Sequence, residues 1–255
     1  MQIHDKVCVV TGAAGGIGAA LARGFAAEGA KGIVVADKHD LVRDVALDIK
    51  GQAFIGDVTS ETSVLALIKK AEEFYGQIDV FCSNAGIIYL GSEQAPNDEW
   101  QACWDLHLMA HVFAARNLAP KMASRGDGYL LNTASAAGLL SHINSATYTV
   151  TKHAAVAFAE WLSIAYGDKG VKTSVLCPQA VKTPMLEGRD LGAAAVDGVI
   201  TPEFMAKHVI EAMEREEFLI LPHPEVKDYM RRKSDNTERW LRGMRNYKAL
   251  YPEGI

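Results

Sequence analysis

Short apolar runs alternate along the chain with longer stretches that repeat apolar positions at helical spacing. Runs rich in Val, Ile and Leu are typical of strands buried on both faces of a parallel sheet. They predict strands over residues 6–10, 32–37, 52–55, 78–82, 128–133, 171–177 and 218–221. Helical periodicity predicts helices over residues 19–28, 40–49, 60–75, 99–122, 148–165 and 202–214.

The alternation of strands and helices predicts the fold class. It implies right-handed crossovers and a single-domain, Rossmann-like, doubly wound parallel α/β sheet of about seven strands with helices on both faces. The composition reveals no linker, so we expect residues 1–255 to form one domain. Glycines around an Ala-rich stretch indicate a substrate lid over residues 183–200. Residues 225–255 extend the chain as a C-terminal tail.

Composition narrows the classes of protein to consider. The chain has 255 residues, a formal net charge of -5, 49% hydrophobic and 22% charged residues, which is ordinary for a soluble globular protein. The negative charge argues against nucleic-acid binding, and no apolar run approaches a membrane span. The tail is basic and aromatic, but acids interrupt it, so we favour a helix covering the lid or a subunit interface over a nucleic-acid surface.

The four cysteines are scattered and form no CxxC or Cys/His cluster of metal-ligand spacing. No metal site is expected. The cysteines are expected to be reduced thiols in the core, which favours a cytoplasmic protein. The first predicted strand begins so early that we expect no signal peptide before it, which favours the same location.

A glycine-rich turn joins the first predicted strand to the first predicted helix, with glycines at positions 12, 15, 16 and 18. Glycines allow the backbone to approach a pyrophosphate, which binds where the helix N-terminus presents free N–H groups. Strand, glycine turn and helix therefore predict a dinucleotide-binding, catalytic domain. The alternative is a plain turn whose glycines only pack the helix.

Asp37 ends the second predicted strand, about twenty residues beyond the glycine turn. A carboxylate there can accept hydrogen bonds from both ribose hydroxyls of an adenosine and would repel a 2′-phosphate, which favours NAD over NADP. Lys38 tempers this preference. The alternative role for Asp37 is that of a turn or cap residue.

Tyr148 and Lys152 lie four positions apart on a predicted helix and therefore on one face, with Ser135 upstream at the end of a strand. A phenol beside an ammonium suggests a base. Moving a tyrosine pKa from about 10 to about 7 requires roughly 4 kcal/mol. An exposed ion pair supplies about 0–1 kcal/mol, so a desolvated site and a second positive charge, such as an oxidised nicotinamide, are also needed. Alone, such a pair is typical of any half-exposed helix face.

Together these motifs resemble the short-chain dehydrogenase/reductase family over roughly residues 6–184. The resemblance rests on the glycine turn, Asp37, Asp57-Val58, Asn84-Ala85-Gly86, Ser135, Tyr148-x-x-x-Lys152, Pro178 and Thr183.

The resemblance implies a cofactor role for each motif. Cofactor phosphates would be lined by Gly12, Gly16, Ile17 and Gly18. Asp37 would hold the adenosine ribose, and Asp57 and Val58 the adenine. The segment passing beneath the cofactor would be Asn84, Ala85 and Gly86. The nicotinamide end would be held by Pro178, Val181 and Thr183.

The resemblance also implies the chemistry. Tyr148 would act as general base in oxidation and as general acid in reduction, with Ser135 hydrogen-bonded to the substrate oxygen. Lys152 would bind the nicotinamide ribose and lower the pKa of Tyr148. Such proteins form homodimers through their fourth and fifth helices, or homotetramers.

Two positions depart from the family pattern. His107 occupies the place of an Asn that holds a water next to the catalytic Lys. A relay through its imidazole would depend on pH near 6.5, and the alternative is a packed core His. Gln179 replaces a common Gly after the Pro, so a side chain is expected near the nicotinamide.

The segments above the nicotinamide are mostly apolar. The expected pocket is formed by Ile88, Leu140, His142, Gln179, Met185 and Leu186. Apart from Arg189, these segments have no arginine that could bind a carboxylate or phosphate of the substrate. We therefore expect an NAD-dependent oxidoreductase that interconverts a hydrophobic, aromatic or cyclic secondary alcohol and its ketone. The alternatives are an NADPH-linked ketoreductase and a non-catalytic cofactor-binding regulator.

Overall fold

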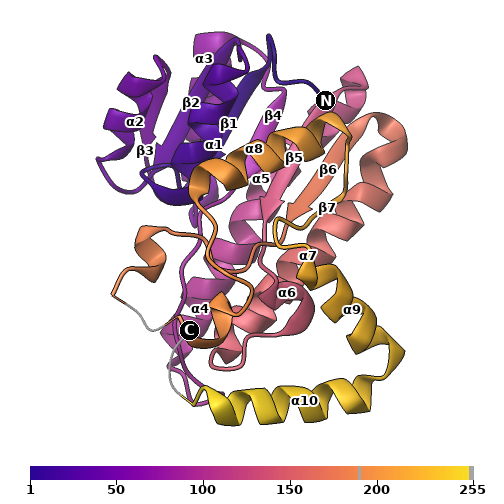
Figure 1. The fold of residues 1–255 in the computed structure, drawn as a ribbon. Helices are drawn as coiled ribbons and strands as arrows, with labels where there is room; N and C mark the ends of the chain where they lie inside the picture. Colours follow the sequence, from indigo (N-terminus) through magenta and orange to yellow (C-terminus); the bar gives the residue numbers. More distant parts are fainter. Residues whose placement is uncertain (189–190, 253–255) are drawn as a thin grey trace.

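The structure, a computed structural model, describes residues 1–188 and 191–252. Seven strands form one parallel sheet in the order β3-β2-β1-β4-β5-β6-β7, as Figure 1 shows. The strands are β1 (Val7–Thr11), β2 (Gly32–Asp37), β3 (Gln52–Ile55), β4 (Val80–Ser83), β5 (Gly128–Thr133), β6 (Val171–Leu176) and β7 (Leu219–Ile220). The predicted fold class is confirmed.

Helices cover both faces of the sheet because alternate residues of each strand point to opposite faces. Cys8 and Val10 pack into one cluster with α1 (Gly16–Ala27), α2 (Val42–Asp48) and α8 (Pro202–Glu214). Val7 and Val9 pack into a second cluster with α3 (Glu61–Tyr75), α5 (Ala110–Arg125) and α7 (Ala146–Tyr166). Two apolar layers therefore enclose the sheet, and its strand ends are free to form a site.

The helix predicted over residues 99–122 is not continuous. It begins as α4 (Asn97–Trp104), widens into a π-helical turn over Asp105–Met109, and continues as α5. Turns of this kind are rare and occur frequently at functional sites. This one contains His107.

The lid leaves the sheet after β6 and returns before α8. Its two ends are joined by a parallel bridge between Val181 and Ile200, with Lys182 N–H donating to the Ile200 carbonyl at 2.9 Å. Within it lie two short 3-10 turns, Pro184–Leu186 and Gly192–Ala195.

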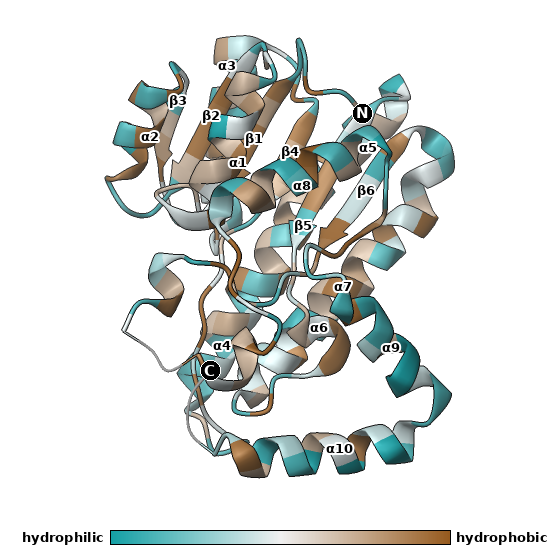
Figure 2. Ribbon diagram, in the orientation of Figure 1, coloured by the Kyte–Doolittle hydropathy of each residue, from teal (hydrophilic) through white to brown (hydrophobic). Residues whose placement is uncertain are grey.

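The tail forms two helices, α9 (Glu225–Asp235) and α10 (Thr237–Leu250). In Figure 1, α9 leads away from the sheet and α10 crosses the end of the molecule that carries α4 and the short α6 (Ala137–Leu140). Figure 2 shows α9 as mostly hydrophilic and α10 as a mixture of hydrophilic and hydrophobic residues, whereas β1, β2 and β4 are mostly hydrophobic. Within residues 1–188 and 191–252, no helix has the length and apolar character needed to cross a membrane.

Candidate active site

A cavity of about 1810 Å³ runs along the carboxyl ends of the strands. Its wall begins at the loops after β1 and β2, passes the ends of β4, β5 and β6, and continues to the lid and α10. The strand order reverses between β1 and β4, and ligands of doubly wound sheets bind at such a point.

The loop between β1 and α1 has the geometry of a phosphate cradle. Gly12 and Gly16 have φ values of 65° and 54°, which favour glycine, and both line the cavity with Ile17. A Cβ on Gly12 would lie 2.6 Å from the Cα of Ala85. α1 begins after Gly15 with no side-chain cap and no acid in its first turn. No side chain therefore competes with an anion for the N–H groups at its N-terminus. The loop fits a dinucleotide pyrophosphate.

Gly18 does not line this cavity, contrary to the prediction. A Cβ there would lie 2.3 Å from the carbonyl oxygen of Gly12 and 2.7 Å from Nδ2 of Asn84. Its missing side chain lets α1 pack closely against the loop. Gly18 therefore supports the conformation of the loop by packing against it, on the side away from the cavity.

Asp37 fastens the cradle to β2. Its Oδ2 accepts a hydrogen bond from the Ala14 N–H at 3.0 Å, and its Oδ1 accepts one from the His39 N–H at 3.0 Å. The carboxylate therefore has the turn role that the sequence left open. It also lines the cavity, as do Asp57 and Val58. Each carboxylate oxygen retains acceptor capacity for a ribose hydroxyl.

The segment after β4 is hydrogen-bonded to both neighbouring strands. Thr11 Oγ1 accepts from the backbone N–H groups of Asn84 at 3.0 Å and Ala85 at 3.3 Å. The Asn84 side chain donates to the Thr11 carbonyl at 3.0 Å and accepts from Thr133 Oγ1 at 3.2 Å. Gly86 continues along the cavity wall. These bonds hold three strand ends together beneath the cavity.

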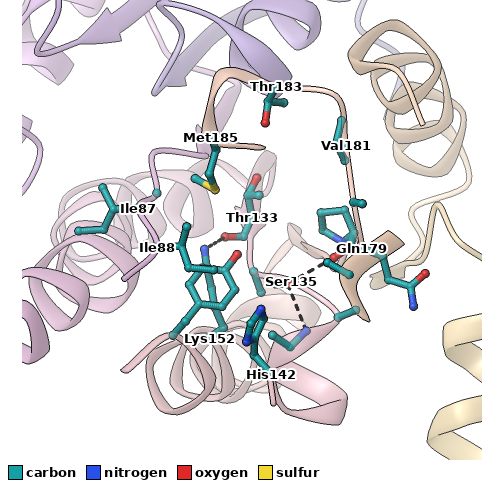
Figure 3. A pocket seen from close by; sticks show the side chains of 18 of the residues that line it. Ile87, Ile88, Thr133, Ser135, His142, Lys152, Gln179, Val181, Thr183 and Met185 are labelled. Carbon is teal, nitrogen blue, oxygen red and sulfur yellow. Dashed lines mark hydrogen bonds between the residues drawn. The ribbon is translucent and has the colours of Figure 1, made fainter. Parts of the chain in front are cut away.

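Ser135, Tyr148 and Lys152 converge on the cavity from β5 and α7. Ser135 Oγ donates to the Pro178 carbonyl at 3.3 Å and accepts from the Ala137 N–H at 3.1 Å. Buried Lys152 donates from Nζ to the Thr133 carbonyl at 3.0 Å, and this Nζ lies 5.6 Å from the centre of the Tyr148 ring. Figure 3 shows the Lys152 and Ser135 hydrogen bonds at the base of the pocket.

Burial dominates the electrostatics of this pair. It raises the pKa of Tyr148 to about 12, although the Ser135 hydroxyl acts in the opposite direction. Burial also lowers the pKa of Lys152 to about 8. The protein side chains alone therefore keep Tyr148 a neutral phenol near neutral pH. The lowered Tyr148 pKa that the resemblance implies would need a further positive charge in the site.

His107 is buried beside Lys152, a setting that disfavours the pH-dependent relay considered for it. Burial, reinforced by the charge of Lys152, lowers the pKa of His107 well below its ordinary value. Its Nε2 accepts from the Ile87 N–H at 3.2 Å, which places the proton of the neutral ring on Nδ1, 2.8 Å from Thr151 Oγ1. The ring packs edge-on against Tyr148 with centroids 5.4 Å apart. These contacts match the alternative, a packed core His.

Gln179 connects the strand end to the lid. Its Nε2 donates to Asp197 Oδ2 at 2.9 Å, and its backbone N–H donates to His223 Nδ1 at 3.3 Å. Together with Pro178, Val181 and Thr183, it lines the cavity where the nicotinamide end was expected. The Gln179 side chain, which a Gly at this position would lack, therefore adds a hydrogen bond across the base of the lid.

All the expected substrate-pocket residues line the same cavity, namely Ile88, Leu140, His142, Gln179, Met185 and Leu186. His142 lies edge-on to Tyr148 at 6.1 Å between ring centroids, and burial lowers its pKa to about 4. Its Nδ1 accepts from the Asn144 N–H at 3.1 Å. The neutral His142 ring therefore carries its proton on Nε2.

The tail supplies cavity residues that the sequence did not predict as part of the pocket, namely Tyr229, Arg232, Asn236, Arg239, Trp240, Met244 and Tyr247. The Tyr229 hydroxyl donates to Asp197 Oδ1 at 2.9 Å, and the Tyr247 hydroxyl donates to the Ala193 carbonyl at 3.0 Å. Both bonds join the tail to the lid. The only signal in the sequence was the basic, aromatic composition of this segment. Arg189 lies outside the described residues.

The four cysteines are buried free thiols. Within the described part of the chain, His, Cys, Asp and Glu side chains form no group of three or more that could hold a metal ion.

Comparison with known proteins identifies the family. A sequence model of the family described as short chain dehydrogenase matches residues 6–192. The chain is a member of the short-chain dehydrogenase family. It is 32% identical to a 1-deoxy-11-beta-hydroxypentalenate dehydrogenase of Streptomyces exfoliatus, over 94% of this chain and 90% of the relative. It is 31% identical to a 3beta-hydroxysteroid dehydrogenase of Mediterraneibacter gnavus, over 73% of this chain and 70% of that protein.

Solved structures of the family match this short-chain dehydrogenase over most of its length. A short-chain dehydrogenase/reductase from Burkholderia phymatum in complex with NAD has a TM-score of 0.83 and 26% identity, covering 93% of this chain and 96% of that chain. A 3-ketoacyl-(acyl-carrier-protein) reductase from Brucella melitensis complexed with NADH has a TM-score of 0.79 at 24% identity, over 86% of this chain and 96% of its own, a likeness of fold alone. The family and the oxidoreductase class predicted from the sequence are confirmed.

Proposed function

We propose that this short-chain dehydrogenase uses NAD to interconvert a hydrophobic, cyclic or aromatic secondary alcohol and its ketone, with Tyr148 as general base and acid. The observation that carries the proposal is the convergence of Ser135, Tyr148 and Lys152 on an apolar chamber at the strand ends. A protein that only binds a cofactor has no need of a proton acceptor there.

Each member of this set has a separate task. In oxidation, Oη of Tyr148 accepts the proton of the substrate hydroxyl, and in reduction it returns it to the ketone oxygen. In this structure Ser135 Oγ donates its hydrogen to the Pro178 carbonyl and accepts from the Ala137 N–H. When substrate binds, the hydroxyl turns this hydrogen from Pro178 to the substrate oxygen and stabilises its charge. Bound NAD supplies the hydride-accepting ring. Lys152, anchored to Thr133, holds positive charge beside the phenol.

The side chain of Asp37 supports NAD rather than NADP. It lines the cavity beside the glycine cradle, and a 2′-phosphate there would meet its negative charge. The Burkholderia phymatum structure, which holds NAD, is consistent with this preference. An NADPH-linked ketoreductase is the second candidate, and Lys38 on the same wall is what favours it.

The wall above Tyr148 supports the proposed substrate class. Ile87, Ile88, Leu140 and Met185 present apolar surface there, as Figure 3 shows for three of them. The Streptomyces and Mediterraneibacter relatives are named for hydroxylated pentalenate and hydroxysteroid substrates. Both observations support a bulky cyclic alcohol.

We also infer a homodimer through the α5 and α7 faces. α7 exposes Trp161 at 56% and Ile164 at 82% of their surfaces, which a partner helix would bury. Sedimentation of the wild-type protein and of Ile164→Glu tests this. A monomeric wild-type protein would contradict it.

The function is tested by the appearance of NADH when the protein is mixed with NAD and a panel of aliphatic, aromatic, terpenoid and steroidal secondary alcohols, repeated with NADP. We expect turnover of cyclic alcohols with NAD, and Asp37→Ser should shift preference toward NADP. Turnover confined to NADP would support the ketoreductase alternative. Measurable NADH binding without turnover of any alcohol or ketone in the panel would support the regulator.

A further inference from the structure

The tail brings two arginines to the wall of the substrate chamber. Arg232 lies in the last turn of α9 and Arg239 in the first turn of α10, and both line the cavity. In the part of the chain that the structure describes, neither guanidinium has an ion-pair or hydrogen-bond partner, whereas neighbouring Arg231 pairs with Asp228 at 3.2 Å. Both arginines are exposed on the cavity wall, so their N–H donors are accessible to an anionic group of a ligand.

Arg232 is held in place by an aromatic ring rather than by a charge. Its guanidinium lies 5.6 Å from the ring centre of Tyr229, and the Tyr229 hydroxyl is bonded to Asp197 of the lid. Contact with a ring face leaves the N–H donors at the edge of the guanidinium free for a planar anion. Tyr229 thus orients the cation without neutralising it.

The acids near this site do not cancel its charge. Asp235 lines the cavity between the two arginines in sequence, so this part of the wall has two cations and one anion. Asp197 of the lid already accepts hydrogen bonds from Gln179 and from Tyr229, and Asp228 already pairs with Arg231. Asp37, Asp57, Asp98 and Asp105 line other parts of the cavity.

Apolar side chains share the cavity wall with these arginines and with Ser135 and Tyr148. Trp240, in the first turn of α10, packs in one cluster with Leu139 and Leu140 of α6, and Met244 lines the same cavity. A ligand that reaches from Ser135 and Tyr148 to the arginines therefore has hydrophobic side chains beside it. Such a ligand has an alcohol at one end, an apolar body and an anion at the other end.

We propose that the substrate is an amphipathic secondary alcohol with a carboxylate remote from its hydroxyl-bearing carbon, and that Arg232 and Arg239 bind this carboxylate. The proposal rests on the proposed function for the alcohol end of the ligand. The tail is then the element that selects an acid over its neutral analogue.

The test compares an acid with its methyl ester in two double variants of the full chain. R232Q/R239Q removes the cavity arginines. R231Q/R242Q is the matched control, because it changes the same charge on the same two helices at exposed residues outside the cavity wall. The probes are decanoate and methyl decanoate, which have no secondary alcohol, and lithocholate and methyl lithocholate, which have one. Calorimetry with NADH present gives the affinities, and NADH formation from NAD gives turnover of the steroids.

We expect R232Q/R239Q to weaken decanoate and lithocholate binding about tenfold or more and to change the ester affinities less than about twofold. R231Q/R242Q should change all four less than about twofold. High salt should weaken binding of the acids by the wild type and leave the esters unaffected. Equal losses for acid and ester, or equal losses in both double variants, would overturn the proposal.

Turnover separates this proposal from the proposed function. If alcohols are oxidised but acids and esters bind alike, the carboxylate site is wrong and the oxidoreductase stands. If acids bind through the two arginines but no alcohol is oxidised, the carboxylate site stands and the proposed reaction is wrong.

Discussion

The floor and the roof of the cavity are built in opposite ways. We call the strand ends with Thr11, Asn84, Thr133, Ser135 and Lys152 the floor, and the lid with α9 and α10 the roof. In the floor, Lys152 is 2% and Thr11 3% exposed, and backbone hydrogen bonds fix most side chains. In the roof, Val226 is the buried residue of α9, and α10 has none in its described range.

The difference suits the role proposed for each part. Proton transfer requires atoms held within hydrogen-bond reach, and only a packed sheet edge fixes them that closely. Within the roof, the Tyr229 hydroxyl of α9 donates to Asp197 of the lid, and Lys233 attaches the roof to the Leu139 carbonyl of α6. Elements with few buried contacts open at low free energy, which suits the entry of a bulky substrate. Changes in the floor should therefore cost far more than changes in the roof.

The largest effect is expected from Tyr148→Phe. Removing the proton acceptor should lower kcat by about 10²–10⁴-fold while leaving NADH affinity within about twofold. Stopped-flow measurement of turnover and fluorescence titration of NADH check both quantities. A variant that kept the wild-type kcat would show that Tyr148 is not the base.

Gly12→Ala should be the most destabilising change in the floor. The new Cβ would require an unfavourable φ of 65° and would lie 2.6 Å from the Cα of Ala85, at a combined cost of about 3 kcal/mol or more. Gly126→Ala is the control, since its φ is 73° but nothing lies within 4 Å, and it should cost about 1 kcal/mol. Urea denaturation measures both. Equal losses would mean that close packing against Ala85 is unimportant.

Stability should fall on the acid side because of His111. Burial lowers its pKa to about 3 from an ordinary value of 6.5. Between these pH values the unfolded chain holds more protons at this site, so the free energy of unfolding falls as pH decreases, by up to about 1.4 kcal/mol per unit.

Replacing His111 by Leu should make the free energy of unfolding less dependent on pH, by up to the contribution of one proton, or about 1.4 kcal/mol per pH unit. Urea denaturation between about pH 5 and 7 measures this dependence. The exposed His4→Leu, which removes a histidine from the surface, serves as the control. An unchanged slope in His111→Leu would show that His111 does not gain a proton when the chain unfolds.

A smaller effect is expected in the roof from Tyr229→Phe. Losing the hydroxyl bond to Asp197 should cost about 1 kcal/mol of lid attachment and raise KM by about fivefold, with NADH affinity unchanged. Hydrogen exchange of residues 191–200 should become faster. Tyr166→Phe, remote from the lid at the end of α7, is the control. If exchange stayed at the wild-type rate, the tail would not hold the lid.

The smallest effect is expected from His107→Asn on the pH profile of turnover. Burial, reinforced by the charge of Lys152, lowers the pKa of His107 well below its ordinary value and so favours the neutral ring. The profile of kcat between about pH 5.5 and 8 should therefore have the same shape in both proteins. A wild-type inflection near 6.5 that disappeared in the variant would restore the relay.

Several features followed from the sequence because they are local. The glycine turn needs positive φ at two nearby positions, and Tyr148 and Lys152 share a helix face because they lie four residues apart. The alternation of apolar runs and helices fixed the layered sheet, and parallel strand ends necessarily meet at one edge. The sequence alone therefore determined the fold, the glycine turn and the placement of Tyr148 and Lys152 on one helix face.

Tertiary structure decided the features that depend on contacts between distant segments. The tautomer of His107 follows from its contacts with Ile87 and Thr151, which are remote from it in the chain. Its lowered pKa follows from burial, which no local sequence pattern encodes. The protonation of Tyr148 likewise follows from desolvation by packed neighbours. Amphipathic helices such as α9 and α10 can be predicted individually. Their orientation in the molecule depends on the elements against which their apolar faces pack. Only folding could place Arg232, Arg239 and Trp240 on the cavity wall.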